Sequence, residues 1–201
     1  QAAQMINSAV RPVLYLGGGI ISSQAHQQAI QLAEQAGLPT TMTLMALGAM
    51  PVDHPLSLGM LGMHAARSTN LILQQADLLI VLGATFDDRA IGKAEQFCPD
   101  ASIIHIDIDP AELGKIRRPH LAMNADIKQA LTHLLPLVET RSRSEWRSTV
   151  SDMQREFPFN QPNSTNPLCH YGLIRAAAEA LDDDTIITTD VGQHQMWVAQ
   201  A

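Results

Sequence analysis

The sequence predicts an α/β fold with a doubly wound, Rossmann-like parallel sheet. Short apolar runs alternate with segments of helical periodicity over roughly the first two thirds of the chain. Some of these runs, such as LLIVL, are apolar throughout, which is typical of parallel strands that are buried on both faces. A glycine turn, Gly17–Gly19, directly follows the first run. Strands that alternate with helices in this way form a parallel sheet with right-handed crossovers.

Composition narrows the classes of protein that fit. The 201 residues are 46% hydrophobic and only 16% charged, with a net charge of −7. These values indicate a globular protein and argue against a nucleic-acid surface. No apolar run approaches the length of a membrane span. Cys98 and Cys169 form no CxxC pair, so we expect a reduced, cytoplasmic protein. Both ends of the chain suggest a fragment of a longer protein.

The first half of the chain is expected to begin with a short helix and a strand over residues 13–16. The glycine turn leads into a helix that is N-capped by Ser22 or Ser23 and that ends at Ala36, where Gly37 is a natural stop. Residues 39–44 form the second strand. Residues 45–64 have no clean period and are too apolar for a disordered segment, so we expect a ligand-facing loop.

The second half continues the alternation and then changes character. A helix over residues 65–75 precedes a buried strand over residues 76–84. Two further strands are expected at residues 102–107 and 120–123, and a final helix begins after Asp126 as N-cap. A linker with one helix follows, and a second unit starts near Asn166 with a helix and a strand over residues 185–190.

Four junctions follow the predicted strands. Ligands in open α/β sheets bind at the carboxyl ends of the strands, so these junctions should converge on one crevice. They are Gly17–Gly19, Thr43–Leu44, Gly83–Arg89 and Asp107–Asp109. The glycine turn and the following helix suit an anion such as a phosphate, although such a turn can also serve only to pack a helix tightly on the sheet.

The acidic and basic residues at these junctions have two interpretations each. Asp107 and Asp109 could bind a ribose, or Asp109 could cap the turn before Pro110. Arg89 in the segment FDDR could pair with a phosphate, or it could bridge to Asp87 or Asp88. The turn is not GxGxxG and the second strand lacks an acidic end, so an ordinary NAD dehydrogenase is disfavoured.

Histidines give weaker indications of a site. His64 follows LGMLGM at the start of a helix and is either a cap or core residue or a functional one. His54, between Asp53 and Pro55, fits turn chemistry. His194, which follows Gly192 at the end of a predicted strand, suits a polar or phosphorylated ligand. No GxSxG, HExxH or Walker sequence is present in the chain.

The motifs together resemble one family. LYLGGG, LGMLGMH, GATFDDR, HIDIDP and TDVGQHQMW occur in the order found in the catalytic subunits of acetohydroxyacid synthase, also called acetolactate synthase. These are thiamine-diphosphate enzymes. The resemblance covers essentially the whole chain. The pattern is similar to that of a bacterial isozyme, in particular isozyme I. It implies that residues 1–140 form the central FAD-binding domain. Residues 141–165 would be a linker with one helix, and residues 166–201 the start of the thiamine-diphosphate-binding domain.

The resemblance also implies which residues contact the cofactors. Those expected at FAD are Gly17, Gly18, Gly19, Thr43, Leu44, Leu61, Gly62, Met63, His64, Gly83, Ala84, Asp87, Arg89, Asp107, Ile108, Asp126 and Ile127. Those expected at thiamine diphosphate are Val191, Gly192, Gln193 and His194. Two departures from the family pattern stand out: Thr85 replaces a frequent arginine, and Ala125 replaces the glycine of a common Gly-Asp pair.

The parent subunit is expected to decarboxylate pyruvate and to condense the product with pyruvate or 2-oxobutyrate, for branched-chain amino-acid biosynthesis. The resemblance implies FAD, thiamine diphosphate and Mg²⁺ as cofactors, and a homodimer of catalytic subunits with a small regulatory subunit. The catalytic glutamate and the magnesium motif of the family have no counterpart in these residues, so we expect no catalytic or metal-binding residue here and no activity from this stretch alone.

Other functions remain compatible with the residues. A related thiamine-diphosphate flavoenzyme, such as pyruvate oxidase or glyoxylate carboligase, shares the flavin domain but runs another reaction. A non-catalytic nucleotide-binding or assembly module is the alternative from a different class. An NAD-dependent dehydrogenase would need a substrate domain that is not apparent.

Overall fold

The protein consists of two compact units, which are described separately. They comprise Gln1–Pro158 and Phe159–Ala201 in a computed structural model that describes residues 1–182 and 184–201. No helix within these described ranges is long and apolar enough to cross a membrane.

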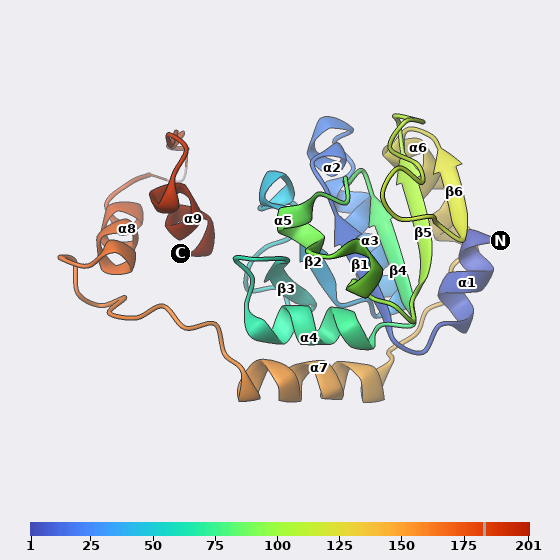
Figure 1. The fold of residues 1–201 in the computed structure, drawn as a ribbon, viewed down its shortest axis with the longest axis horizontal. Helices are drawn as coiled ribbons and strands as arrows, with labels where there is room; N and C mark the ends of the chain where they lie inside the picture. The colour runs from blue at the N-terminus through green and yellow to red at the C-terminus, as the bar shows by residue number, and fades with distance from the viewer. Residues whose placement is uncertain (183) are drawn as a thin grey trace. The chain divides into compact units, whose positions relative to one another are not determined.

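The first unit, all of whose residues are described, is built on a six-stranded parallel sheet (Figure 1). The strands lie in the order β3-β2-β1-β4-β5-β6, and each neighbouring pair is parallel. Their bounds are β1 (Pro12–Leu16), β2 (Thr40–Met42), β3 (Ser57–Met60), β4 (Leu78–Leu82), β5 (Ser102–Asp107) and β6 (Leu121–Asn124). This order is that of a doubly wound dinucleotide-binding domain, so the predicted fold class is confirmed.

Helices cover both faces of the sheet because its central strands are apolar on both sides. In β1, Leu14 and Leu16 belong to one hydrophobic cluster, whereas Val13 and Tyr15 belong to the other. The first cluster is covered by α1 (Ala2–Ser8), α2 (Gly19–Ser22), α3 (His26–Ala36) and α6 (Ile127–Leu134), with the 3₁₀ turns η1 (Leu44–Ala46) and η3 (Leu135–Leu137). The second is covered by α4 (Arg67–Gln75), α5 (Asp88–Ile91) and α7 (Ser144–Glu156), and η2 (Ala94–Gln96) lies beside it.

The helix after the glycine turn begins later than expected. The chain forms the single turn α2 and then restarts at His26 as α3, with Ala25 in the N-cap position. The prediction of Ser22 or Ser23 as N-cap is therefore wrong. The hydroxyl of Ser23 instead donates to Gly19 O at 2.7 Å and helps to end α2. Gly37 ends α3 in the left-handed conformation with φ of 63°, as predicted.

The segment 45–64 contains a strand that was not predicted from the sequence. Residues 57–60 form the edge strand β3, which pairs with β2 through an irregular register. The prediction of an unbroken loop is wrong there, because SLGM has neither strict alternation nor a continuous apolar run. The remainder is irregular, as expected.

Helix α7 packs against the sheet within the first unit. The buried Trp146 donates its indole N–H to Pro12 O at 3.1 Å, at the start of β1, and the buried Val150 joins the same cluster. Gln154 donates to Ser57 O at 3.3 Å, at the start of β3. The helix inside the predicted linker therefore contributes to the core of the first unit.

The second unit contains α8 (His170–Glu179) and α9 (Gln193–Gln200). Residues 185–190 form no strand, so that element of the prediction is wrong for this structure. A strand needs a neighbour for its backbone hydrogen bonds, and none of residues 159–182 and 184–201 forms one. Residues 185–190 are exposed.

Candidate functional site

The glycines at the ends of β1 and β4 interlock. Gly19 N donates to Gly83 O at 3.0 Å, and Gly17 N donates to Leu82 O at 2.9 Å. A Cβ atom on Gly17 would lie 2.1 Å from Gly83 O, and one on Gly19 would lie 2.8 Å from Gly83 Cα. Gly83 itself has φ of 57° and a Cβ there would lie 2.5 Å from Ile127 Cδ1. These three glycines therefore let two loops touch at the point where the sheet changes direction.

Gly18 differs from its neighbours in the turn. A Cβ atom on Gly18 would lie 3.2 Å from Met45 Cβ and 3.9 Å from Met45 O, with no other heavy atom as near. Met45 is an exposed side chain in η1, the 3₁₀ turn that follows β2. At Gly18 the near neighbour is thus the exposed Met45, whereas Gly17 and Gly19 pack against the backbone of the loop after β4.

The end of β2 lies beside this turn. Thr43 N donates to Leu16 O at 2.9 Å, and Leu44 begins the 3₁₀ turn η1. The hydroxyl Oγ1 of Thr43 is buried and has no hydrogen-bond partner in the described part of the chain. A buried polar atom without a partner is uncommon in folded proteins, and at a crevice it can be satisfied by a ligand.

The loop after β3 rests on the loop after β4. Met63 N donates to Arg89 O at 2.9 Å, and a Cβ atom on Gly62 would lie 2.3 Å from that same oxygen. Asn70 of α4 holds the peptide of Gly62 from the other side, accepting from its N–H at 3.2 Å and donating to its carbonyl at 2.9 Å. Leu61 is buried beneath, while Met63 is exposed.

Asp87 and Arg89 have separate roles in the segment after β4. Asp87 is the N-cap of α5, since its Oδ1 accepts from Arg89 N at 3.1 Å and from Ala90 N at 3.0 Å. The guanidinium of Arg89 is exposed and makes no ion pair with any residue that the structure describes. The internal bridge to Asp87 or Asp88 is therefore absent, and the charge faces solvent.

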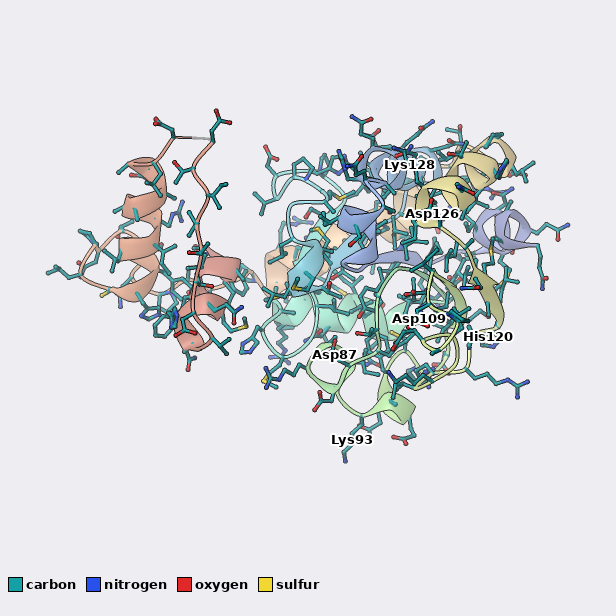
Figure 2. The ribbon with its side chains drawn as sticks, turned by 90° about the horizontal axis from the view of Figure 1, so that it is seen from above. Asp87, Lys93, Asp109, His120, Asp126 and Lys128 are labelled. Carbon is teal, nitrogen blue, oxygen red and sulfur yellow. The ribbon has the colours of Figure 1, made fainter. Side chains whose placement is uncertain are left out.

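The acidic residues at the ends of β5 and β6 accept hydrogen bonds from backbone N–H groups that follow them. Asp107 Oδ1 accepts from Asp109 N at 2.9 Å, and Asp109 Oδ1 accepts from Ala111 N at 2.8 Å. Asp126 is the N-cap of α6 and accepts from Gln129 N at 2.9 Å, as predicted. Figure 2 looks onto this edge from above and labels Asp87, Asp109 and Asp126 in the connections that follow β4, β5 and β6. Ile108, which stands between Asp107 and Asp109 in the sequence, is exposed.

The predicted thiamine-diphosphate residues lie in the second unit, apart from the crevice in sequence. Val191 and Gly192 precede α9, and Gln193 and His194 form its first turn. The ring of Trp197 in α9 stacks on His170 of α8 with centroids 4.2 Å apart. Within the described ranges, no cluster of His, Cys, Asp and Glu could hold a metal ion.

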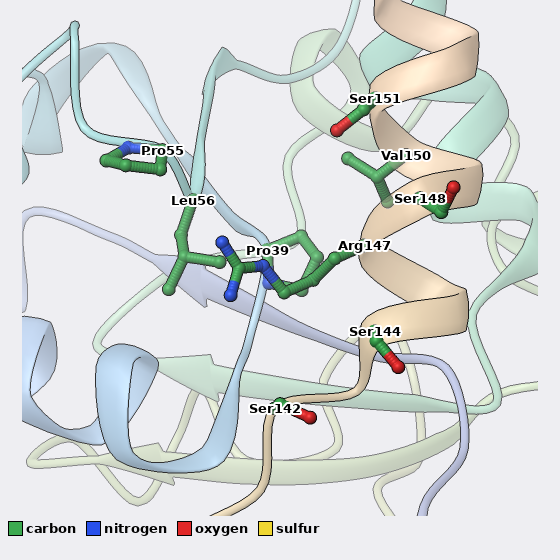
Figure 3. A pocket seen from close by; sticks show the side chains of 9 residues that line it. All are labelled: Pro39, Pro55, Leu56, Ser142, Ser144, Arg147, Ser148, Val150 and Ser151. Carbon is green, nitrogen blue, oxygen red and sulfur yellow. The ribbon is translucent and has the colours of Figure 1, made fainter.

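A separate groove of about 440 Å³ lies at the amino edge of the sheet, next to α7 (Figure 3). Pro39 and Leu56, which precede β2 and β3, form one wall. Arg147 extends from α7 over them. This groove lies at the edge of the sheet opposite the loops after β1, β2, β4 and β5.

Sequence reasoning missed three residues that shape the crevice, namely Tyr15, Asn70 and His105. For Tyr15 and His105 the available signal was a polar side chain inside an apolar strand, as in VLYL and SIIHID. Tyr15 and His105 both form hydrogen bonds to backbone carbonyls of the loop after β4. His54 fulfils the turn role expected for it, since its Nδ1 accepts from Leu56 N at 3.2 Å.

A parallel sheet in this order, with glycine loops meeting at its switch point, is the arrangement typical of nucleotide-binding α/β domains. The chain belongs to the family of the thiamine pyrophosphate enzyme, central domain, whose model matches residues 1–134. The family likeness that the motifs indicated is thereby confirmed.

Similar proteins share the whole length of the chain. It is 67% identical over 200 residues to the acetolactate synthase isozyme 1 large subunit of Escherichia coli, covering 100% of this chain and 35% of that protein. It is 42% identical over 206 residues to acetolactate synthase 1, chloroplastic, of Zea mays, covering 100% of this chain and 32% of that protein. It is 40% identical over 201 residues to isozyme 2 of Escherichia coli, covering 100% and 36%. The chain thus spans about a third of the length of these relatives.

Proposed function

We propose that this chain is the FAD-binding central part of an acetolactate synthase catalytic subunit, together with the beginning of its thiamine-diphosphate-binding domain. In this proposal residues 1–140 form the FAD domain, and residues 141–165 form the connection whose helix packs on it. Residues 166–201 begin the next domain. The names of the relatives and the order of the sequence motifs support this assignment.

Three features of the crevice fit a dinucleotide such as FAD. The backbone of Gly18 allows close approach, the Thr43 hydroxyl lacks a partner in the described chain, and Arg89 offers an unpaired guanidinium. Arginine binds phosphate oxygens in a bidentate manner, which a pyrophosphate group would satisfy. The unpaired charge of Arg89 is the observation that carries the proposal, because folding alone does not use it.

The residues of this chain hold and orient cofactors and do not perform bond chemistry. When bound, thiamine diphosphate supplies the electron sink for decarboxylation of a 2-oxo acid, while FAD takes no net redox part. Gly18, Thr43 and Arg89 would fix the flavin nucleotide, and Met63 and His64 would border it from the loop after β3. Val191 to His194 would meet the diphosphate end of thiamine.

We also propose that Mg²⁺ binds beside the diphosphate and that the substrates are pyruvate and 2-oxobutyrate. The catalytic subunits would form a homodimer with a cytoplasmic location. The relatives from Escherichia coli are named as large subunits, which supports a small regulatory subunit as partner.

The test is a titration of the purified 201-residue chain with FAD, followed by flavin absorbance and fluorescence, with NAD as the control ligand. We expect saturable FAD binding that Arg89→Ala weakens about tenfold, the effect of ~1.4 kcal/mol. Arg147→Ala is the matched control, because this arginine is also exposed and unpaired among the described residues but lines the groove at the opposite edge. Preference for NAD, or a folded chain that binds no FAD, would contradict the proposal.

A further inference from the structure

Two buried polar side chains stand on either side of the central strand β4. Tyr15 in β1 is opposite Val81 in β4, and Val81 is opposite His105 in β5. Tyr15 and His105 therefore occupy one row across three strands and project to the same face of the sheet. Both side chains are fully buried.

The loop after β4 returns over this row. Tyr15 Oη donates to Thr85 O at 3.1 Å, and His105 Nε2 lies 3.1 Å from Ala84 O. Because a carbonyl oxygen only accepts, Nε2 carries the proton. Two consecutive carbonyl groups of the loop are thus held from two different strands.

The ring of Phe86 contacts both polar side chains. Its centroid is 6.1 Å from that of Tyr15 and 5.3 Å from that of His105, and both contacts are edge-to-face at 86°. Phe86 is buried, with 4% of its surface exposed. Three successive residues of the loop, Ala84 to Phe86, therefore have fixed contacts.

These contacts do not follow from the needs of the core. Burial raises the pKa of the Tyr15 hydroxyl above its ordinary range, helped by the Asp87 and Cys98 groups, and burial lowers the pKa of His105. Burial therefore favours the neutral form of both groups, against the pull of the Asp107 carboxylate 3.9 Å from His105 Nε2. His105 Nδ1 has no partner in the described chain. An unpaired buried nitrogen destabilises the folded state by about 1–3 kcal/mol. An aliphatic residue at position 105, as at its neighbours Ile104 and Ile106, would avoid this loss.

We propose that Tyr15 and His105 are positioning residues that fix the loop after β4, and through it Arg89, for binding of the flavin nucleotide. The inference rests on the proposed function. The fixed backbone of Phe86 constrains the next residue, Asp87, whose carboxylate accepts from Arg89 N and Ala90 N. The loop after β3 is constrained in turn, because Arg89 O accepts from Met63 N. One anchored loop thereby orients two of the crevice walls.

The test compares Tyr15→Phe, His105→Leu and His105→Gln with the unmodified chain. Glutamine places an amide donor near the position of Nε2, so His105→Gln should keep the hydrogen bond to Ala84 O that His105→Leu loses. Tyr171→Phe is the matched control, because it removes a tyrosine hydroxyl that bonds to Gln200 in the second unit. FAD affinity and hydrogen–deuterium exchange are measured for each variant, the latter without any ligand.

Tyr15→Phe and His105→Leu should each weaken FAD binding about tenfold, which equals ~1.4 kcal/mol, within the range of one hydrogen bond. Exchange in peptides covering residues 84–91 and 61–64 should rise about threefold or more, while β1, β4 and β5 stay protected. His105→Gln and Tyr171→Phe should resemble the unmodified chain.

Unchanged loop exchange in folded Tyr15→Phe would overturn the inference, even if FAD binds. Unchanged FAD affinity in a variant with faster loop exchange would overturn the link to the ligand. Failure of the unmodified chain to bind FAD would refute the proposed function instead, and the exchange data would still decide whether these residues position the loop. Since Tyr15→Phe removes a single oxygen, its result stands if His105→Leu does not fold.

Discussion

Replacing Gly17 or Gly18 by alanine should separate the two roles of the glycine turn. A Cβ atom on Gly17 would lie 2.1 Å from Gly83 O and 2.4 Å from Ala84 Cα. Carbon atoms pack best at about 3.5–4.0 Å, so these distances are deep overlaps. Both neighbours are backbone atoms of an anchored loop, which cannot move aside as a side chain would.

The expected magnitude for Gly17→Ala follows from that rigidity. Overpacking a core typically destabilises by about 1–3 kcal/mol, and we expect ~3 kcal/mol or more here. Domains of this kind are stable by only about 5–15 kcal/mol, so a large share of the stability would be lost. Flavin binding should disappear together with the folded loop contact.

Gly18→Ala should behave differently. Gly18 has φ of −56° and ψ of −22°, which alanine adopts without strain. Its Cβ would lie 3.2 Å from Met45 Cβ, and the Met45 side chain, 74% exposed, can shift. The free energy of unfolding should stay within about 1 kcal/mol of the unmodified value, because a compatible Gly→Ala change stabilises by ~0.4–1 kcal/mol. FAD affinity should fall about tenfold, since the methyl group and the displaced Met45 add bulk at the turn that we propose to contact the nucleotide.

The assay is urea denaturation followed by far-ultraviolet circular dichroism, with FAD titration of each folded variant. The reasoning would be refuted by a Gly17→Ala chain as stable as the unmodified one. It would also be refuted if Gly18→Ala lost more stability than Gly17→Ala.

Three further predictions follow from buried side chains. Trp146→Ala should lower the free energy of unfolding by about 3–5 kcal/mol because it empties a buried site beneath β1, whereas a loss under about 1 kcal/mol in urea denaturation would show that α7 is not part of the core. Burial raises the pKa of the Cys98 thiol to about 12, so Ellman's reagent at pH 8 should label Cys169 alone until urea is added, and rapid labelling of two thiols in the folded chain would contradict the packing. Burial also lowers the pKa of His105 from its ordinary 6.5, so the unfolded chain binds the extra proton and stability should fall as the pH drops below about 6.5, by at most ~1.4 kcal/mol per pH unit. Urea denaturation between pH 7.5 and 5 should show this fall in the unmodified chain but less of it in His105→Gln, and equal slopes would contradict a neutral, buried imidazole.

Much of the fold could be predicted because its strands carry strong local signals. The strand over residues 102–107 matches β5 in full, and Gly37 and Asp126 end and begin their helices as expected. The strand β3 could not be predicted, since only its neighbour β2 makes SLGM extended. The break between α2 and α3 also lies beyond local pattern, because the hydroxyl of Ser23 can bond forward as an N-cap or backward to Gly19.

The candidate site was predictable as a place but not in its details. Parallel topology alone required the loops after β1, β2, β4 and β5 to meet at one edge. The role of each glycine depends on which distant part of the chain lies against it. Gly17 is an example, because it packs against Gly83 of another loop. The anchoring of the β4 loop by Tyr15 and His105 likewise needs the strand order, because these residues are far apart in sequence.

The most direct test of the central idea is to locate FAD on the chain by amide NMR. The ¹⁵N-labelled chain is titrated with FAD, and shifts are mapped onto assigned amides. Our account predicts that the largest shifts occur at Gly18, Thr43 and Arg89, with none at Arg147 or Ser148 in the groove at the opposite edge. Shifts confined to that groove, or no shifts at the crevice in a folded chain, would contradict it.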